Sequence, residues 1–183
     1  DKVRPLAEFK IYIAATPAAE ISRLSRVTGP GEEVIAQHGG NLGRRMFGVT
    51  CELFARGHAP VILIGTDTPD LPPSFLQRSL NLLNQCDLVF GPALDGGYYL
   101  VGMRRLEGRI FENIDWGTDT VFKKTLAVCR KYKLACELLE PLRDIDRPDD
   151  LLALAEQCKL EQAETVPISR RTAQIIKTFI KGG

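Results

Sequence analysis

The stretch Pro60-Val-Ile-Leu-Ile-Gly-Thr-Asp-Thr-Pro-Asp-Leu-Pro-Pro73 joins an apolar run directly to a turn with two carboxylates. Four consecutive branched apolar residues, Val61–Ile64, are typical of a strand buried on both faces of a sheet. Asp67 stands where that strand ends, and ligands of open α/β sheets bind just outside strand ends. The stretch therefore predicts either a ligand site at Asp67 or a plain turn in which Asp67 and Asp70 cap the next helix.

The composition indicates one globular domain with a sizeable core, because the 183 residues are 44% hydrophobic and 26% charged. Basic residues number 24 and acidic residues 23, so no net field favours nucleic acid or an anionic membrane surface. The five cysteines are widely spaced and never form Cys-x-x-Cys, which favours reduced thiols and a cytoplasmic location. No apolar run approaches the roughly 20 residues of a membrane span.

Strand-like and helix-like segments alternate along the chain, which predicts a three-layer α/β domain. Strand patterns cover residues 9–15, 33–37, 61–64, 87–90, 98–103 and 134–139. Helical patterns cover residues 18–26, 42–57, 72–83, 118–129, 148–155 and 169–179, with Asn41, Thr118 and Ser169 as expected N-caps. We expect residues 1–158 to form the domain and residues 159–183 to form a linker, near 161–166, and an amphipathic C-terminal helix.

Four loops rich in Asp, Gly or aromatic residues follow the strands, and each allows two interpretations. In the loop 95–99 two glycines permit close approach of a ligand and the tyrosines can stack on a sugar or base, yet Asp-Gly is also a strong hairpin signal. Trp116 is a ligand contact or a core aromatic beside a helix cap. In the loop 143–150, Asp149 and Asp150 suit a helix N-terminus, whereas Asp144 and Asp146 precede the helix and are free to bind.

Two carboxylates from different strand ends would suit a hard divalent cation. Mg²⁺ takes one or two protein carboxylates and completes its shell with phosphates and waters. Such a cation would neutralise charge on a leaving diphosphate. His38 and His58 are isolated, so they do not predict a zinc site. The sequence has no Gly-x-Ser-x-Gly elbow, so it does not predict a serine hydrolase.

The ordered motifs resemble a bacterial family of glycosyltransferases in the nucleotide-diphospho-sugar transferase superfamily. This superfamily also includes molybdenum-cofactor guanylyltransferases and the guanylyltransferase of coenzyme F420 synthesis. The likeness covers about residues 9–154 and rests on Gly65-Thr-Asp-Thr-Pro-Asp-Leu-Pro, Gly91-Pro-Ala-Leu-Asp-Gly-Gly-Tyr-Tyr-Leu-Val-Gly, Asp115-Trp-Gly-Thr and Arg143-Asp-Ile-Asp-Arg-Pro-Asp-Asp-Leu. Gln37-His-Gly-Gly-Asn-Leu-Gly-Arg-Arg-Met46 is similar to a further family segment.

The resemblance implies a Rossmann-like, mostly parallel α/β/α sheet of the glycosyltransferase type A kind. It implies that Asp67 occupies the catalytic, metal-binding aspartate position and that Asp146 completes a Mg²⁺ or Mn²⁺ site. The substrate-side positions that it implies are Asp95, Gly96, Gly97, Tyr98 and Trp116, with Asp70, Arg44 and Arg45 as weaker candidates. The implied reaction is transfer of a sugar from a nucleoside-diphosphate sugar to an acceptor that the sequence does not name.

The family pattern opens with a strand, a basic nucleotide-binding loop and a helix. The residues before Phe9 do not supply this segment. We therefore expect an N-terminally incomplete copy of an enzyme, with the edge of the strand 61–64 left open. A degenerate relative without catalysis, and a module that pairs its open edge with another chain, are the alternatives. Nucleotidyl transfer with release of pyrophosphate is the other enzymatic interpretation, and a homo-oligomer remains open.

Overall fold

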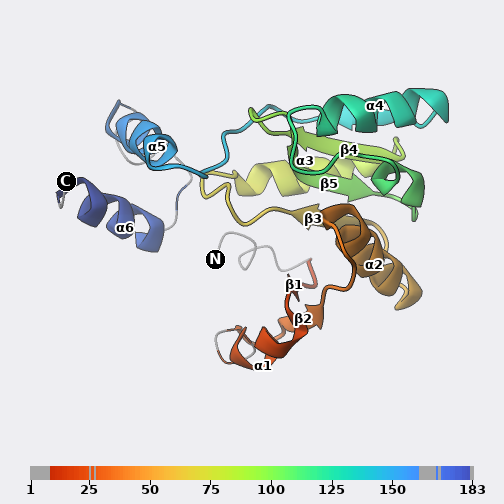
Figure 1. Cartoon of the computed structure of the whole chain (residues 1–183), viewed down its shortest axis with the longest axis horizontal. Coiled ribbons are helices and arrows are strands. Elements are labelled where there is room, and N and C mark those ends of the chain that lie inside the picture. Colours follow the sequence, from red (N-terminus) through yellow and green to blue (C-terminus); the bar gives the residue numbers. More distant parts are fainter. Residues whose placement is uncertain (1–8, 25, 27, 161–167, 169, 182–183) are drawn as a thin grey trace.

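The computed structural model describes residues 9–24, 26, 28–160, 168 and 170–181. Within these residues the chain forms a mixed α/β structure (Figure 1). The elements in chain order are β1 (Tyr12–Ala15), a 3₁₀ turn η1 (Ala18–Glu20), α1 (Ile21–Leu24), β2 (Glu33–Ala36), α2 (Leu42–Ala55), β3 (Val61–Ile64), α3 (Pro73–Leu83), β4 (Leu88–Pro92), β5 (Tyr98–Met103), a second 3₁₀ turn η2 (Gly108–Phe111), α4 (Val121–Lys131), β6 (Cys136–Leu138), α5 (Pro148–Leu160) and α6 (Arg170–Lys181).

The larger sheet has four strands in the order β3-β5-β4-β6. β5 runs antiparallel to both of its neighbours, whereas β4 and β6 pair in parallel. The hairpin that joins β4 to β5 contains Asp95 and Gly96, so the Asp-Gly signal for a hairpin is confirmed. The expected α/β class is also confirmed, with parallel and antiparallel pairings mixed in one sheet.

Successive residues of a strand point to opposite faces of the sheet, so an apolar strand presents apolar side chains on both faces. Helices cover both faces of this sheet. On β4, Val89 packs with the α3 residues Leu76 and Leu83. Leu88 and Phe90 on the same strand face the opposite way and pack with Cys129 of α4. All three β4 side chains are fully buried. The result is the three-layer arrangement of helix, sheet and helix that Figure 1 shows.

β1 and β2 form a separate two-stranded parallel sheet. α2 bridges this sheet to the larger one, because its Val49 and Leu53 pack with Ile35 of β2 and Val61 of β3. β3 pairs with β5 on one side only. The expectation that strand 61–64 has an open edge is therefore confirmed for the residues described.

α5 and α6 pack against each other through a small apolar cluster that includes Leu154, Ala155 and Ile176. In Figure 1 this pair lies to one side of the sheet. Pro148 is the first helical residue of α5, with Asp149 and Asp150 in the first turn, as expected. The expected linker near 161–166 and the cap at Ser169 lie outside the described residues. No described helix is long and apolar enough to cross a membrane.

Three element boundaries differ from expectation. The first strand covers only Tyr12–Ala15 of the expected residues 9–15, and the expected helix 18–26 is a 3₁₀ turn followed by the single turn of α1. Thr118 does not cap α4, which begins at Val121 after Thr120. The Thr118 hydroxyl instead donates to the carbonyl of Asp115 at 2.8 Å. This bond stabilises the turn that precedes the helix.

Candidate functional site

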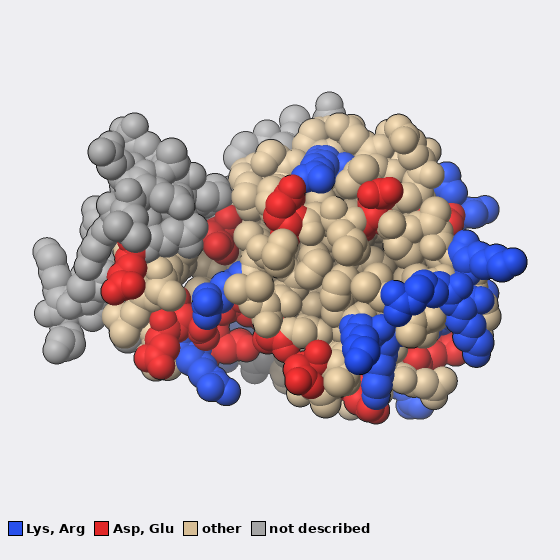
Figure 2. Space-filling model, turned by 90° about the horizontal axis from the view of Figure 1, so that it is seen from above, with Lys and Arg blue, Asp and Glu red and all other residues tan. Residues whose placement is uncertain are grey.

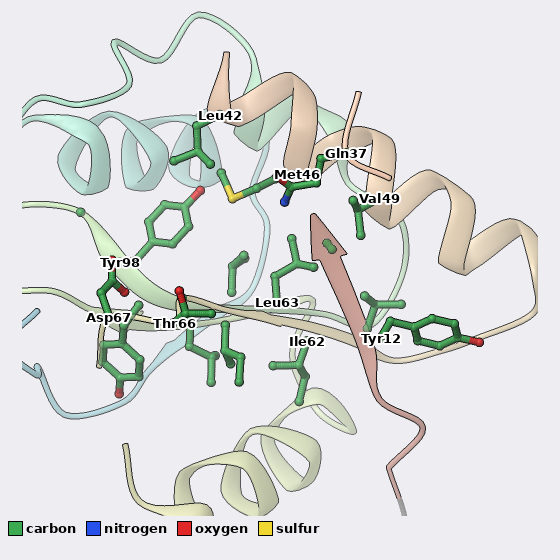
Figure 3. Close-up of a pocket in the computed structure, with 18 of the residues that line it drawn as sticks. Tyr12, Gln37, Leu42, Met46, Val49, Ile62, Leu63, Thr66, Asp67 and Tyr98 are labelled. Atoms are coloured by element: carbon green, nitrogen blue, oxygen red, sulfur yellow. The ribbon is translucent and has the colours of Figure 1, made fainter. Parts of the chain in front are cut away.

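A cleft of about 1330 Å³ separates the two sheets. Its lining comes from β1, α2, β3 and the start of β5, and from the loops that follow β3, β4, η2 and β6. In Figure 3, Leu42, Met46 and Val49 project from α2 toward Leu63 of β3, while Thr66 and Asp67 stand at the end of that strand. We call this space the central cleft. It has a largely apolar middle and an acidic end.

Four aspartates from three loops form the acidic end: Asp67, Asp95, Asp144 and Asp146. Backbone hydrogen bonds fix the three loops to one another. The amide of Ile145 donates to the carbonyl of Asp67 at 2.9 Å. The amide of Leu94 donates to the carbonyl of Leu142 at 3.0 Å, next to a parallel bridge between Ala93 and Leu142. We call these four residues the aspartate cluster.

The position of Asp67 depends on Gly65, the residue that follows β3. The amide of Gly65 donates to the carbonyl of Tyr99 at 2.8 Å, which extends the pairing with β5 by one residue. A Cβ at position 65 would lie 2.6 Å from Oδ1 of Asp67, closer than real Cβ contacts allow. Gly65 therefore leaves room for the exposed Asp67 side chain to fold back over the strand end.

Asp144 is the most perturbed member of the cluster. Burial, together with the negative charges of Asp95, Asp67 and Asp146, raises its pKa to about 7. Its Oδ1 atom is buried and has no hydrogen-bond partner in the described part of the protein. A buried carboxyl oxygen without a partner is costly, and an approaching cation would supply the missing interaction.

The turn at residues 95–97 is rigid because its backbone groups are used internally. Asp95 Oδ1 accepts from the amide of Gly97 at 2.8 Å, and the carbonyl of Gly96 accepts from the amide of Phe122 at 2.9 Å. Gly96 has a φ of 93°, and a Cβ there would lie 2.1 Å from the carbonyl oxygen of Asp119. Asp119, rather than a ligand, makes the close approach to Gly96, whereas Gly97 lines the central cleft.

Trp116 and Tyr98 form one aromatic wall of the cleft. Their ring centroids lie 6.1 Å apart in an edge-on arrangement, and Trp116 also contacts Phe111 at 6.4 Å. Burial raises the pKa of Tyr98, and Figure 3 shows its hydroxyl pointing toward Leu42 rather than toward Asp67. Trp116 thus serves both as a packed aromatic and as a cleft residue. Tyr99 also lines the cleft but is only 2% exposed, and its hydroxyl donates to the carbonyl of Glu140 at 2.9 Å, so stacking of this ring on a ligand stays a prediction.

The weaker candidates do not line the cleft. Asp70 belongs to the turn after β3, where the amide of Leu71 donates to the carbonyl of Thr68. Neither Arg44 nor Arg45 is among the lining residues. The amide of Arg44 donates to the Asn41 side chain at 2.9 Å, which confirms Asn41 as the N-cap of α2. The sequence indicates no site role for the lining residues Gln37, Leu42, Met46 and Asp119, among others, and it marks Asp144 only as free to bind.

Charge is distributed unevenly along β5. The aspartate cluster lies near the start of this strand, whereas Arg104 and Arg105 follow its end. On the face shown in Figure 2, Lys and Arg gather mainly at the end away from α5. Lys10 is the one Lys or Arg among the described residues that line the cleft. Among the residues with described positions, the acidic end therefore has no basic lining residue to neutralise it, although the whole chain carries a net charge of only +1.

A metal site cannot be read directly from the side chains. Among the residues that the structure describes, no group of three or more His, Cys, Asp or Glu residues could hold a metal ion. A site built from only two carboxylates is compatible with this finding, because Mg²⁺ completes its shell with phosphates and waters.

Comparison with solved structures identifies a close structural match. It is the crystal structure of a "putative nucleotide-diphospho-sugar transferase" from Desulfovibrio desulfuricans G20, with a TM-score of 0.85 and 29% sequence identity. The match covers 98% of this chain and 80% of that one. The α/β/α fold of this superfamily is therefore the fold of the present chain.

Among curated proteins, the 2-phospho-L-lactate guanylyltransferase of Methanocorpusculum labreanum is 27% identical over 100 residues. This match covers 53% of the present chain and 44% of the relative, so it spans less than half of that protein's length. A family profile matches a larger share, residues 1–118. The chain therefore belongs to the bacterial family described as "Uncharacterized protein conserved in bacteria (DUF2064)".

Proposed function

We propose that this protein transfers a sugar from a nucleoside-diphosphate sugar to an acceptor in a reaction that needs Mg²⁺ or Mn²⁺. The observation that carries the proposal is the aspartate cluster at the end of a cleft in a transferase fold. Asp67 and Asp146 would hold the cation against the diphosphate. A cation bound there would stabilise the negative charge that develops on the leaving phosphate.

The charge of the cleft supports the need for a cation. A diphosphate alone would be repelled by Asp67, Asp95 and Asp146, and within the described part of the chain no Lys or Arg side chain lines that end. A divalent cation between the carboxylates and the phosphates would convert this repulsion into attraction. The buried Oδ1 of Asp144 is an additional oxygen that can face the cation, because the positive charge would favour the ionised form of this carboxyl group.

The remaining lining residues would bind and orient the substrates. The hydrogen-bonded turn at 95–97 holds the Asp95 carboxylate beside Asp144 without a moving backbone. Trp116 and Tyr98 offer an aromatic wall for a sugar or base. Placing the acceptor hydroxyl against the sugar in a fixed geometry would add to the stabilisation that the cation gives to the leaving phosphate.

Nucleotidyl transfer is the second candidate, and the likeness to a guanylyltransferase favours it. The same cation would then stabilise pyrophosphate as it leaves a nucleoside triphosphate. Release of pyrophosphate would identify nucleotidyl transfer, whereas release of a nucleoside diphosphate would identify sugar transfer.

Thermal unfolding with nucleoside-diphosphate sugars, nucleoside triphosphates and Mg²⁺ or Mn²⁺ tests the site. A ligand at 100 times its Kd stabilises the fold by about 2.7 kcal/mol. For a domain of this size that energy raises Tm by roughly 5–11 °C. We expect the rise only when nucleotide and cation are both present, and we expect Asp67→Asn to abolish it.

Asp149→Asn is the matched control, because Asp149 is an exposed carboxylate in the first turn of α5 and does not line the cleft. This variant should keep the full ligand shift. Equal shifts for Asp67→Asn and wild type would contradict the role of Asp67, and the absence of a shift with every nucleotide tested would contradict the proposed function.

A further inference from the structure

Two cysteines meet at the junction between α4 and β6. Cys129 is buried near the end of α4, and Cys136 is the first residue of β6. Both side chains pack in the apolar cluster on the α4 side of the larger sheet. Both are free thiols, and they form a hydrogen bond with each other. Neither thiol has a role in the proposed transferase reaction.

The backbone holds the two thiols in place. The amide of Leu134 donates to the carbonyl of Cys129 at 3.0 Å, which closes the turn after α4. The amide of Ala135 donates to Oδ2 of Asp87 at 3.0 Å, and the carbonyl of Ala135 accepts from the amide of Asp87 at 2.8 Å. The chain is thus fixed on both sides of the turn, directly before Cys136. The contact between the thiols therefore belongs to the fold and not to a free surface loop.

The fold selects one partner for Cys136. Of the four cysteines whose side chains the structure describes, only Cys129 and Cys136 share a cluster. Cys86 packs with Val89 on the α3 side of the sheet, which is the opposite face. Cys51 belongs to α2 and to neither of these two clusters.

The pair has a thiol that ionises readily and a path to solvent. The hydrogen bond between the thiols lowers the pKa of Cys129 and raises the pKa of Cys136. One proton therefore leaves the pair more easily than a second, and the thiolate is the form that attacks an oxidant. Cys129 is only 2% exposed, but Cys136 is partly exposed on β6, which pairs only with β4 among the described strands. A small oxidant can approach along this edge of the sheet.

We propose that Cys129 and Cys136 form a reversible disulfide when the protein meets a peroxide. The bond would close a loop of eight residues, 129–136, and tie the end of α4 to the start of β6. Asp144 and Asp146 follow the other end of β6, so this modification site is separate from the aspartate cluster. The inference goes beyond the proposed transferase reaction and does not depend on it.

The chemistry balances with one molecule of hydrogen peroxide. The Cys129 thiolate attacks one peroxide oxygen, so that an S–O bond forms, the O–O bond breaks and hydroxide leaves. The sulfur of Cys136 then attacks the sulfur of this sulfenic acid, so that the S–S bond forms, the S–O bond breaks and a second hydroxide leaves. The two thiol protons convert both hydroxides to water. Each sulfur is oxidised by one electron, and a dithiol reductant reverses the bond by thiol–disulfide exchange.

Peptide mapping of the folded 183-residue chain after treatment with hydrogen peroxide tests the proposal. Trypsin cleaves after Lys and Arg, and Arg130, Lys131 and Lys133 lie between the two cysteines. The tryptic peptides 125–130 and 134–143 therefore stay joined only through a disulfide. We expect the joined peptides after the remaining thiols are alkylated, and we expect dithiothreitol to separate them. A disulfide from Cys136 to Cys86, or sulfinic acids without a cross-link, would overturn the proposal.

Two variants sharpen the test. Cys136→Ala removes one partner at a partly exposed position, so we expect this variant to fold and to keep Cys129 free of any disulfide after peroxide. Cys51→Ala is the matched control, because Cys51 is also partly exposed but lies on α2, and it should keep the cross-link. A disulfide at Cys129 in Cys136→Ala, at the yield of the wild type, would contradict the assigned pairing. The wild-type peptide map does not depend on either variant.

Urea denaturation tests whether the bond fits the folded state. A disulfide that closes a loop of eight residues should raise the midpoint of the oxidised chain by roughly 1 M relative to the reduced chain. Cys136→Ala should have the same midpoint before and after peroxide, which controls for oxidation elsewhere. A wild-type midpoint that does not rise would show that the bond distorts the folded state, and this result would also overturn the proposal.

Discussion

Replacing Gly43 with Ala should destabilise the protein, although Ala is the better helix former. Gly43 is buried in the first turn of α2, against the indole of Trp116. A Cβ at this position would lie 2.3 Å from Nε1, 2.5 Å from Cε2 and 2.8 Å from Cζ2 of that ring. A rigid indole cannot retreat as the end of a flexible side chain can, so both the ring and the helix must shift.

Two opposing effects set the magnitude. Replacing Gly with Ala inside a helix raises the free energy of unfolding by up to about 1 kcal/mol, and by less in a first turn. Overpacking a filled site costs about 1–3 kcal/mol. We expect a net loss of about 1–2 kcal/mol for Gly43→Ala. Gly48→Ala on the same helix is the matched control, because the nearest atom to its Cβ would be the His38 carbonyl oxygen at 3.7 Å, an ordinary contact. The free energy of unfolding of this control variant should rise by about 1 kcal/mol.

Urea denaturation measures both variants. A difference of about 2–3 kcal/mol between them corresponds to midpoints roughly 1 M apart. Trp116 is the only tryptophan in the chain, so its fluorescence reports the displaced ring directly. Stabilisation of both variants by the same amount, with unchanged Trp116 emission in Gly43→Ala, would refute the packing that we describe between α2 and the aromatic wall.

Two further predictions concern pH. The pKa of Asp144 is raised from 3.8 to about 7, so the folded state retains this proton and the metal-free protein loses stability as the pH rises from about 4 to 7. Asp144→Asn should remove that loss and, after allowance for solvent screening, be about 1–2 kcal/mol more stable than wild type at pH 8; an unchanged pH profile of thermal unfolding would contradict the raised pKa. Hydrogen bonds from the Ala135 amide and Arg104 lower the pKa of Asp87, so its contribution is present above pH 3.8 and is lost as the pH falls through the lowered value. Asp87→Asn should cost about 1–2 kcal/mol at pH 7 and approach wild type in acid, and a constant difference between the two proteins would count against this role.

Local patterns predicted most elements because their causes are local. Asn41 caps α2 as expected, since its side chain reaches an amide only three residues away. Val61–Ile64 forms a strand, and Pro73 begins a helix. Thr118 does not cap α4, because its hydroxyl donates to the carbonyl of Asp115 instead of accepting from an amide in the first turn of the helix, and sequence spacing does not distinguish these two local bonds.

The candidate site depended more strongly on distant parts of the chain. The sequence indicates Asp67, Asp95 and Asp146 each from its own loop, and it marks Asp144 only as a residue free to bind. Its raised pKa results from burial and from three carboxylates brought together by pairing between loops far apart in sequence. Gly96 was expected to approach a ligand, but its neighbour is the backbone of Asp119, a contact that no local pattern encodes.

The sequence by itself determined the alternation of strands and helices, the turn that ends at Asp67 and the resemblance that pointed to a transferase. These features follow from side-chain polarity, backbone preferences and short motifs, all of which act over a few residues. Only the tertiary structure decided that the sheet is split into two parts with a cleft between them, and that four aspartates share its end. The physical reason is that strand pairing and electrostatic coupling depend on distances in space, which the positions of residues along the chain do not fix.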